Sequence, residues 1–98
     1  MATIKRFEDL EIWQLAREIS RDVYDITRKD SIKHDFSLID QLRRSSGSIM
    51  DNIAEGFERD GNKEFVQFLS YAKGSAGETR SQLYRAVDQK YIETMNIN

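Results

Sequence analysis

The fold is decided by residues 7–28, which read FEDLEIWQLAREISRDVYDITR. When successive residues are turned by about 100°, apolar and small side chains of this segment fall on one stripe, which is typical of an amphipathic α-helix. The stripe consists of Ile12, Leu15, Ala16, Ile19, Val23, Ile26 and Thr27. The sequence therefore predicts a long helix over residues 7–29 that buries this stripe.

Two further segments have the same periodicity. The first spans residues 36–58, and either Asp35 or Ser37 can cap its amino terminus. The second spans residues 62–90 and follows a turn in which Gly61 or Asn62 can serve as the cap. The expected core faces are Leu38, Ile39, Leu42, Ser46, Ile49, Ile53 and Phe57 on the first, and Phe65, Phe68, Leu69, Ala72, Ala76, Thr79, Leu83, Ala86 and Val87 on the second.

Proline is absent, where average usage of roughly 5% would give several. Long helices joined by short connections pack antiparallel. We therefore expect an all-α, up-and-down antiparallel helical bundle that forms a single domain over residues 1–98. The last eight residues could extend the third helix or fray.

The composition excludes several classes of site. The chain has no cysteine and a single histidine, His34, which we expect to be exposed in a connection. No disulfide, thiolate nucleophile or Cys-type zinc site is then available. The sequence offers no catalytic constellation, cofactor site, metal site or small-molecule substrate, so we expect a protein that is not an enzyme. An apolar run of about 18 residues is missing, so a cytoplasmic location without a membrane span is expected.

Four ordered blocks carry a resemblance to a known family: FEDLEIWQLA (7–16), QLRRSS (41–46), NIAEGF (52–57) and KEFVQFL (63–69). They resemble the "four helix bundle protein" family, also called the bacterial 23S ribosomal RNA intervening-sequence protein family. Members are similar in fold to the accessory variability protein of diversity-generating retroelements, a homopentamer that binds nucleic acid and a reverse transcriptase. The resemblance therefore implies a pentamer, and nucleic acid or a nucleic-acid enzyme as partner.

The resemblance also implies a fourth helix, because family members usually continue through a Gly-Tyr-Ile-like turn. Here Tyr91-Ile92 is followed by only six residues. We expect an apolar groove to be left open and to be covered by another copy of the chain.

A second face of the first helix is aromatic and basic, and an acidic strip flanks it. Three interpretations remain open: a solvated surface, a face that meets another copy, and a nucleic-acid interface. The sequence pI of about 5.4 weighs against the third. Candidate interface or core-edge anchors are Leu10, Trp13, Tyr24 and Phe57. Candidate nucleic-acid contacts are Arg17, Arg21, Arg28, Arg43 and Arg44.

Small residues within the second and third helices are expected to mark close helix contacts, since glycine inside a helix is unfavourable by roughly 1 kcal/mol relative to alanine. They are Ser45, Ser46, Gly47, Gly74, Ser75, Ala76 and Gly77. The sequence thus favours a non-enzymatic, self-associating interaction module, with direct nucleic-acid binding as the alternative.

Overall fold

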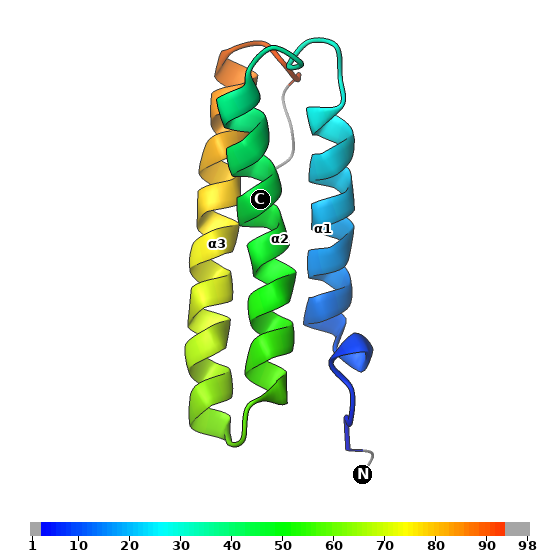
Figure 1. Cartoon of the computed structure of the whole chain (residues 1–98), viewed down its shortest axis with the longest axis vertical. Helices are drawn as coiled ribbons and strands as arrows, with labels where there is room; N and C mark the ends of the chain where they lie inside the picture. Colours follow the sequence, from blue (N-terminus) through cyan, green and yellow to red (C-terminus); the bar gives the residue numbers. More distant parts are fainter. Residues whose placement is uncertain (1–2, 94–98) are drawn as a thin grey trace.

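The computed structural model describes residues 3–93 and contains only helices and connecting turns in that range (Figure 1). A short 3₁₀ helix, η1 (Phe7–Asp9), precedes α1 (Glu11–Thr27), α2 (Phe36–Glu58) and α3 (Asn62–Asp88). The three α-helices run up, down and up along a rod of 47 × 21 × 21 Å. The predicted all-α bundle is confirmed.

The first helix begins later than its periodicity predicts. Leu10 has an extended backbone (φ −75°, ψ 127°), which separates η1 from α1. This break turns Phe7 back onto Trp13, and their ring centroids lie 5.2 Å apart in an edge-to-face arrangement. A continuous helix would not bring the two rings together in this way, because residues six apart are separated by about 120° around a helix and by about 9 Å along it.

The caps of α2 and α3 differ in kind. The Asp35 carboxylate accepts a hydrogen bond from the Leu38 backbone N–H at 3.1 Å, so Asp35 rather than Ser37 caps α2. Gly61 precedes α3 with φ 108°, a conformation that side chains disfavour, and Asn62 is the first helical residue. The turn before α3 therefore depends on the glycine.

α3 ends in a turn with a left-handed residue. Lys90 has φ 64°, and the Tyr91 N–H donates back to the Ala86 carbonyl at 2.9 Å. α3 thus ends at Asp88, two residues before its predicted end, and residues 91–93 do not extend it; residues 94–98 lie outside the described range.

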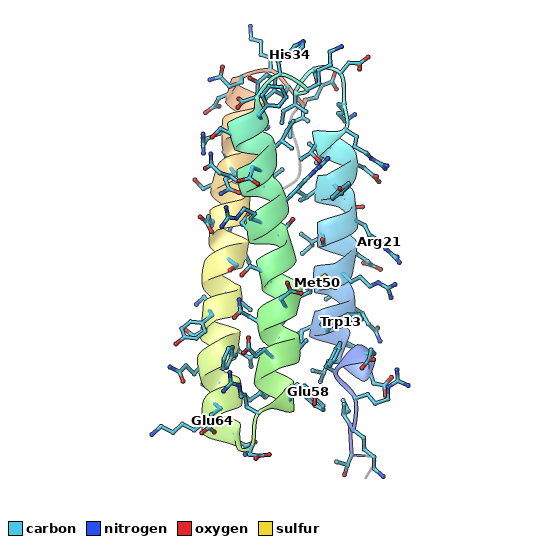
Figure 2. All side chains as sticks on the ribbon, in the orientation of Figure 1. Trp13, Arg21, His34, Met50, Glu58 and Glu64 are labelled. Carbon is cyan, nitrogen blue, oxygen red and sulfur yellow. The ribbon has the colours of Figure 1, made fainter. Side chains whose placement is uncertain are left out.

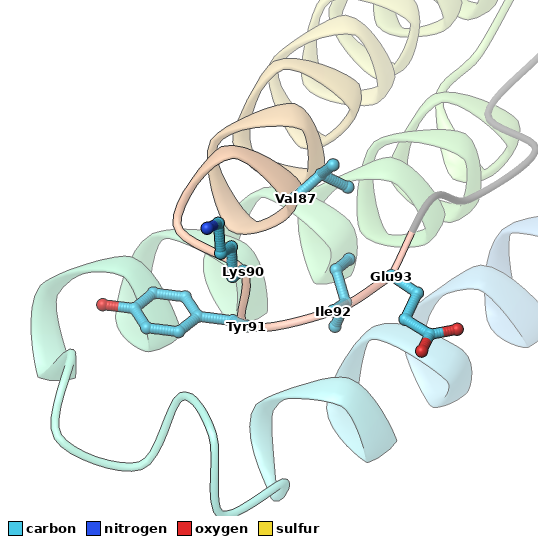
Figure 3. A pocket seen from close by; sticks show the side chains of 5 residues that line it. All are labelled: Val87, Lys90, Tyr91, Ile92 and Glu93. Atoms are coloured by element: carbon cyan, nitrogen blue, oxygen red, sulfur yellow. The ribbon is translucent and has the colours of Figure 1, made fainter.

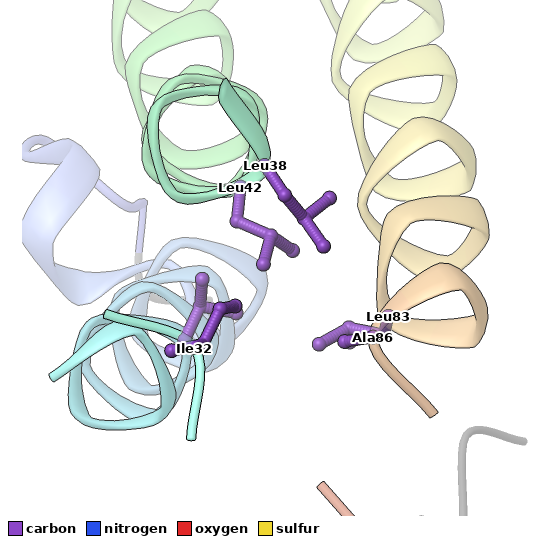
Figure 4. Packing of buried hydrophobic residues seen from close by; sticks show 6 residues of the cluster. Ile32, Leu38, Leu42, Leu83 and Ala86 are labelled. Carbon is purple, nitrogen blue, oxygen red and sulfur yellow. The ribbon is translucent and has the colours of Figure 1, made fainter. Parts of the chain in front are cut away.

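The buried hydrophobic side chains form two clusters along the rod. One, near the α1–α2 turn, contains Leu38 and Leu42 of α2, Leu83 and Ala86 of α3, and Ile32 of the connection (Figure 4). Ile32 is fully buried although it lies in a connection, where sequence periodicity gives no signal. The other cluster contains Ala16, Ile49, Ile53 and Ala72.

Only part of the predicted stripe on α1 is buried. Within residues 3–93, α1 and α3 each pack against α2, and no Cα atoms of α1 and α3 come within 8 Å of one another. Ala16, Val23 and Thr27 face α2 and are buried. The prediction that the whole stripe is core is wrong, because its outer half has no helix opposite it: Ile12, Leu15 and Ile19 are 43%, 57% and 42% exposed.

The prediction of close helix contacts at glycines is also wrong in part. A Cβ atom built on Gly47, Gly74 or Gly77 would meet nothing within 4 Å. The close approach occurs instead at Gly56, where a Cβ would lie 2.6 Å from the Cβ of Phe68. Gly56 therefore sets the distance between α2 and α3 near their connecting turn.

Candidate functional site

The most distinctive surface is an apolar groove of about 310 Å³ that runs between α1 and α3 over α2. One wall is the exposed half of the α1 stripe, and Ile49 and Ile53 of α2 line the floor. The α3 wall consists of Leu69, Ala72, Lys73 and Ala76. Contiguous exposed apolar side chains of this kind mark association surfaces more often than scattered ones do. The groove has the chemistry to take an amphipathic helix or another apolar face.

A second surface lies on the other side of α1, where Tyr24 meets two arginines. The Arg43 guanidinium carbon lies 3.9 Å from the Tyr24 ring centroid, and that of Arg28 lies 5.8 Å from it. Arg43 is held in place because its Nε donates to Thr27 Oγ1 at 2.9 Å, and Thr27 Oγ1 in turn donates to the Tyr24 carbonyl at 2.7 Å. The result is an aromatic cluster with two guanidinium groups across the α1–α2 interface, in which Arg28 also forms an exposed ion pair with Asp25.

The five candidate nucleic-acid arginines do not share one face. Arg17 lies along the same side of α1 as the Tyr24 cluster, with its guanidinium 5.6 Å from the Trp13 ring centroid. Arg21 is exposed, on the side of α1 that points away from α2 (Figure 2). Arg44 instead pairs with Asp40 at 3.6 Å and lines a hollow between α2 and α3. The structure therefore brings Arg28 and Arg43 together and separates Arg44 from them, because Arg43 and Arg44 are adjacent in one helix and diverge by about 100°.

The four candidate anchors have different environments. Leu10 and Trp13 are half-buried against the cluster around Ala16, so both lie at the edge of the core. Phe57 is half-buried and packs edge-to-face on Phe65, with 6.1 Å between centroids. Tyr24, at 47% exposure, is the most accessible of the four.

A polar cluster between α2 and α3 was not anticipated from the sequence. Ser45 Oγ donates to the Gln82 side-chain oxygen at 2.6 Å and accepts from Thr79 Oγ1 at 2.9 Å. All three side chains are buried. Ser45 and Gln82 line a hollow of about 440 Å³ that Arg44 and Glu78 also line. The available signal was Gln82 itself, a polar residue three positions after Thr79 on the core face of its helix.

Another hollow, of about 550 Å³, lies where the chain leaves α3 (Figure 3). Its lining includes Tyr91 and Ile92, and Ile92 packs against the core cluster near Ile32. The Tyr91 hydroxyl donates to Asp35 Oδ2 at 2.9 Å, and this hydrogen bond to a carboxylate raises the pKa of Tyr91. The contacts join the end of α3 to the α1–α2 turn, so they are structural.

Potential metal ligands within residues 3–93 are scattered. No three metal-ligating side chains gather within that range, and His34 is exposed in the turn at the end of the rod (Figure 2). Near the amino terminus, the Glu8 carboxylate accepts from its own backbone N–H and from Arg6, which lowers the pKa of Glu8 and raises that of Arg6. Both of these groups lie on the surface, away from the three hollows.

Comparison with known proteins identifies the family. The family described as "23S rRNA-intervening sequence protein" matches residues 8–98, which is nearly the whole chain. No curated protein and no solved structure matches it. None of the helices within residues 3–93 is long and apolar enough to cross a membrane. The ordered sequence blocks, the helical bundle and this match agree, and the chain belongs to the 23S rRNA-intervening sequence protein family.

Proposed function

We propose that this chain is a non-enzymatic interaction module that self-associates through the groove between α1 and α3. The single observation that carries the proposal is the exposure of Ile12, Leu15 and Ile19 side by side on one wall of that groove. Burying an apolar side chain fully is worth about 1.5–3 kcal/mol, so three half-exposed ones leave a substantial driving force for association. The five-fold assembly implied by the family resemblance is one form that this association can take.

The experiment is absolute mass by light scattering after size exclusion, over a range of protein concentrations and at low and high salt. We expect a mass above that of one 11.5 kDa chain, and we expect the oligomer to persist at high salt because the buried surface is apolar. Leu15→Gln should shift the mass towards one chain. Phe36→Gln is the matched control, because Phe36 is 74% exposed and lies outside the groove.

A wild-type chain that remains at 11.5 kDa over the whole concentration range would overturn the proposal. Equal effects of Leu15→Gln and Phe36→Gln would show that the groove is not the surface involved. Trp13 is a poor probe for this question, because it packs on Phe7 and the core and its removal would destabilise the fold.

A second function, RNA binding, is favoured by a different observation. The Tyr24 cluster presents the Arg28 and Arg43 guanidinium groups on one surface, and the description of the family names 23S rRNA. Arg43 already occupies one face of the Tyr24 ring, so we propose contacts from the guanidinium groups to phosphates rather than stacking of a base on Tyr24. Titration of a fluorescent single-stranded RNA at several salt concentrations tests this proposal. We expect Arg43→Gln to lower the slope of log affinity against log salt concentration by about one. Arg44→Gln should leave that slope unchanged, because Arg44 faces the hollow between α2 and α3. Failure to bind at low salt would exclude this function and leave the first intact.

A further inference from the structure

The hollow between α2 and α3 contains a buried side chain that uses only one of its two polar atoms. Gln82 is 4% exposed, and its side-chain oxygen accepts from Ser45 Oγ at 2.6 Å. No hydrogen bond found within residues 3–93 uses the Gln82 amide nitrogen, and no fully buried side-chain nitrogen or oxygen in that range lacks a partner. This nitrogen must therefore be accessible from outside, and Gln82 lines the hollow. Its two N–H donors are available to a ligand there.

Two buried hydroxyl groups hold the Gln82 amide in this orientation. Thr79 Oγ1 donates to Ser45 Oγ at 2.9 Å, and the Ser45 O–H in turn donates to the Gln82 oxygen. Because Thr79 and Ser45 are both buried, this chain of hydrogen bonds is shielded from solvent. The other amide that lines the hollow, Gln41, already has a hydrogen-bond partner for its nitrogen and for its oxygen. The free amide nitrogen is thus particular to Gln82.

The hollow also carries charges of both signs. Arg44, Asp40 and Glu78 line it, and all three are exposed. Arg44 Nη1 lies 3.6 Å from Asp40 Oδ2, which is longer than a hydrogen bond, and exposed pairs of this kind are weak. Arg44 can therefore exchange Asp40 for the carboxylate of a ligand at little cost. None of the ion pairs found within residues 3–93 uses Glu78, so its carboxylate is available as well.

These groups lie close enough together for one small molecule to contact them all. Glu78 and Gln82 are four residues apart on α3, a spacing that places their Cβ atoms about 5–6 Å apart on one side of the helix. Ser45 of α2 contacts Gln82 directly, so Arg44, its neighbour in the chain, is level with Gln82 along the rod. The donors of Arg44 and Gln82 thus gather at one end of the hollow, and the Glu78 carboxylate lies about one turn away.

We propose that this hollow binds a small free α-amino acid, whose carboxylate contacts the Arg44 guanidinium and the Gln82 amide nitrogen and whose ammonium group contacts Glu78. Such a zwitterion supplies an acceptor where the hollow has donors and a cation where the hollow has a free carboxylate. A simple anion fits less well, because two carboxylates and only one guanidinium line the hollow. The described lining includes no aromatic or aliphatic residue, which favours a ligand whose own side chain is small and polar.

Titration of the whole chain with L-serine, followed by heteronuclear NMR of the Gln82 side-chain amide, tests this site. We expect the Gln82 amide resonances to shift and to saturate, with a dissociation constant at least about tenfold below those of glycerate, which lacks the ammonium group, and ethanolamine, which lacks the carboxylate. Glu78→Gln and, separately, Arg44→Gln should weaken serine binding at least about tenfold, because each removes a charged hydrogen-bond partner. Glu18→Gln and Arg80→Gln are the matched controls, since both residues are exposed and lie outside this hollow.

Three results would overturn the inference. The first is the absence of a saturable shift with L-serine, and the second is binding of glycerate as tight as that of serine, which would make the hollow an anion site only. The third is equal weakening by Glu78→Gln and Glu18→Gln, which would place the binding elsewhere. Circular dichroism verifies that each variant is helical, and the exposed positions of Glu78 and Arg44 leave the buried hydrogen bonds intact. None of these results depends on self-association, so the inference and the proposed function are tested separately.

Discussion

The glycines inside the helices provide the sharpest test of the packing. Gly56 lies in the last turn of α2 and Gly74 lies in the interior of α3, and the structure assigns them opposite roles. At Gly56 an added methyl group would lie 2.6 Å from Phe68 Cβ and 3.2 Å from Phe65 Cδ1. At Gly74 it would meet nothing within 4 Å. Because a Cβ atom is the fixed base of its side chain, the clash at Gly56 can be relieved only by moving the helices apart.

The expected magnitudes follow from two opposing effects. Replacing glycine by alanine in a helix interior stabilises the helix by about 1 kcal/mol, and this effect acts fully at Gly74 and at most to that extent at Gly56, in the last turn of α2. Overpacking in a well-filled contact costs about 1–3 kcal/mol, and this effect acts at Gly56 only. We therefore expect Gly74→Ala to stabilise the protein by about 1 kcal/mol. Gly56→Ala should leave it between unchanged and about 2 kcal/mol less stable, since the steric cost offsets or exceeds the helix gain.

The assay is urea unfolding followed by circular dichroism, with all variants at one protein concentration because the proposed self-association would contribute to stability. Thermal unfolding provides a second measure, and about 1 kcal/mol corresponds to about 4–8 °C in Tm for a domain of this size. The difference between the two variants isolates the steric effect. Equal stabilisation by Gly56→Ala and Gly74→Ala would refute the close approach of α2 and α3 at Gly56.

Three further predictions concern the caps and the polar cluster. Asp35→Ala should destabilise the protein by about 1–2 kcal/mol in urea unfolding, because the Leu38 N–H loses its hydrogen-bond acceptor and the Tyr91 hydroxyl loses its acceptor as well. Asp35→Asn should retain most of the stability. The pKa of Tyr91 is raised in the folded state, so its contribution to stability is complete below about pH 10 and is lost as pH rises through the folded-state value. The phenolate absorbance difference between wild type and Tyr91→Phe measures this, and ionisation of Tyr91 at or below pH 10 would contradict the hydrogen bond. Ser45→Ala should cost about 1–3 kcal/mol in the same unfolding assay, because the buried Gln82 oxygen loses its donor; a neutral result would show that the cluster is hydrated instead.

The sequence predicted the helices because helix formation is a local property. The spacing of Leu38, Leu42, Ile49 and Ile53 identifies the buried face of α2, and Asp35 marks the start of that helix. Each of these signals can be read from neighbouring turns of the same helix. The same local reasoning failed at Leu10, where the helix breaks so that Phe7 can contact Trp13. That break depends on a contact between side chains, which periodicity does not report.

For the candidate sites, the sequence predicted which residues share a face of one helix but not which residues of two helices meet. The sequence placed Arg17, Tyr24 and Arg28 on one side of α1, and the structure keeps them there. The partner of Tyr24, Arg43, comes from another helix, and its neighbour Arg44 faces a different hollow. Which of two adjacent arginines reaches α1 depends on the rotation of α2 about its axis, and the core packing of α2 fixes that rotation.

The sequence by itself determined that this chain forms three amphipathic helices, because apolar spacing, caps and the absence of proline act over a few residues. Only the tertiary structure decided which part of each apolar stripe is buried. Ile12, Leu15 and Ile19 carry the same periodic signal as Ala16 and Val23, yet they line an open groove. The physical reason is that a stripe identifies the side of a helix that avoids water, whereas burial requires a neighbour opposite that side. In the described part of the chain α1 and α3 both pack on α2, and no Cα atoms of α1 and α3 come within 8 Å of one another.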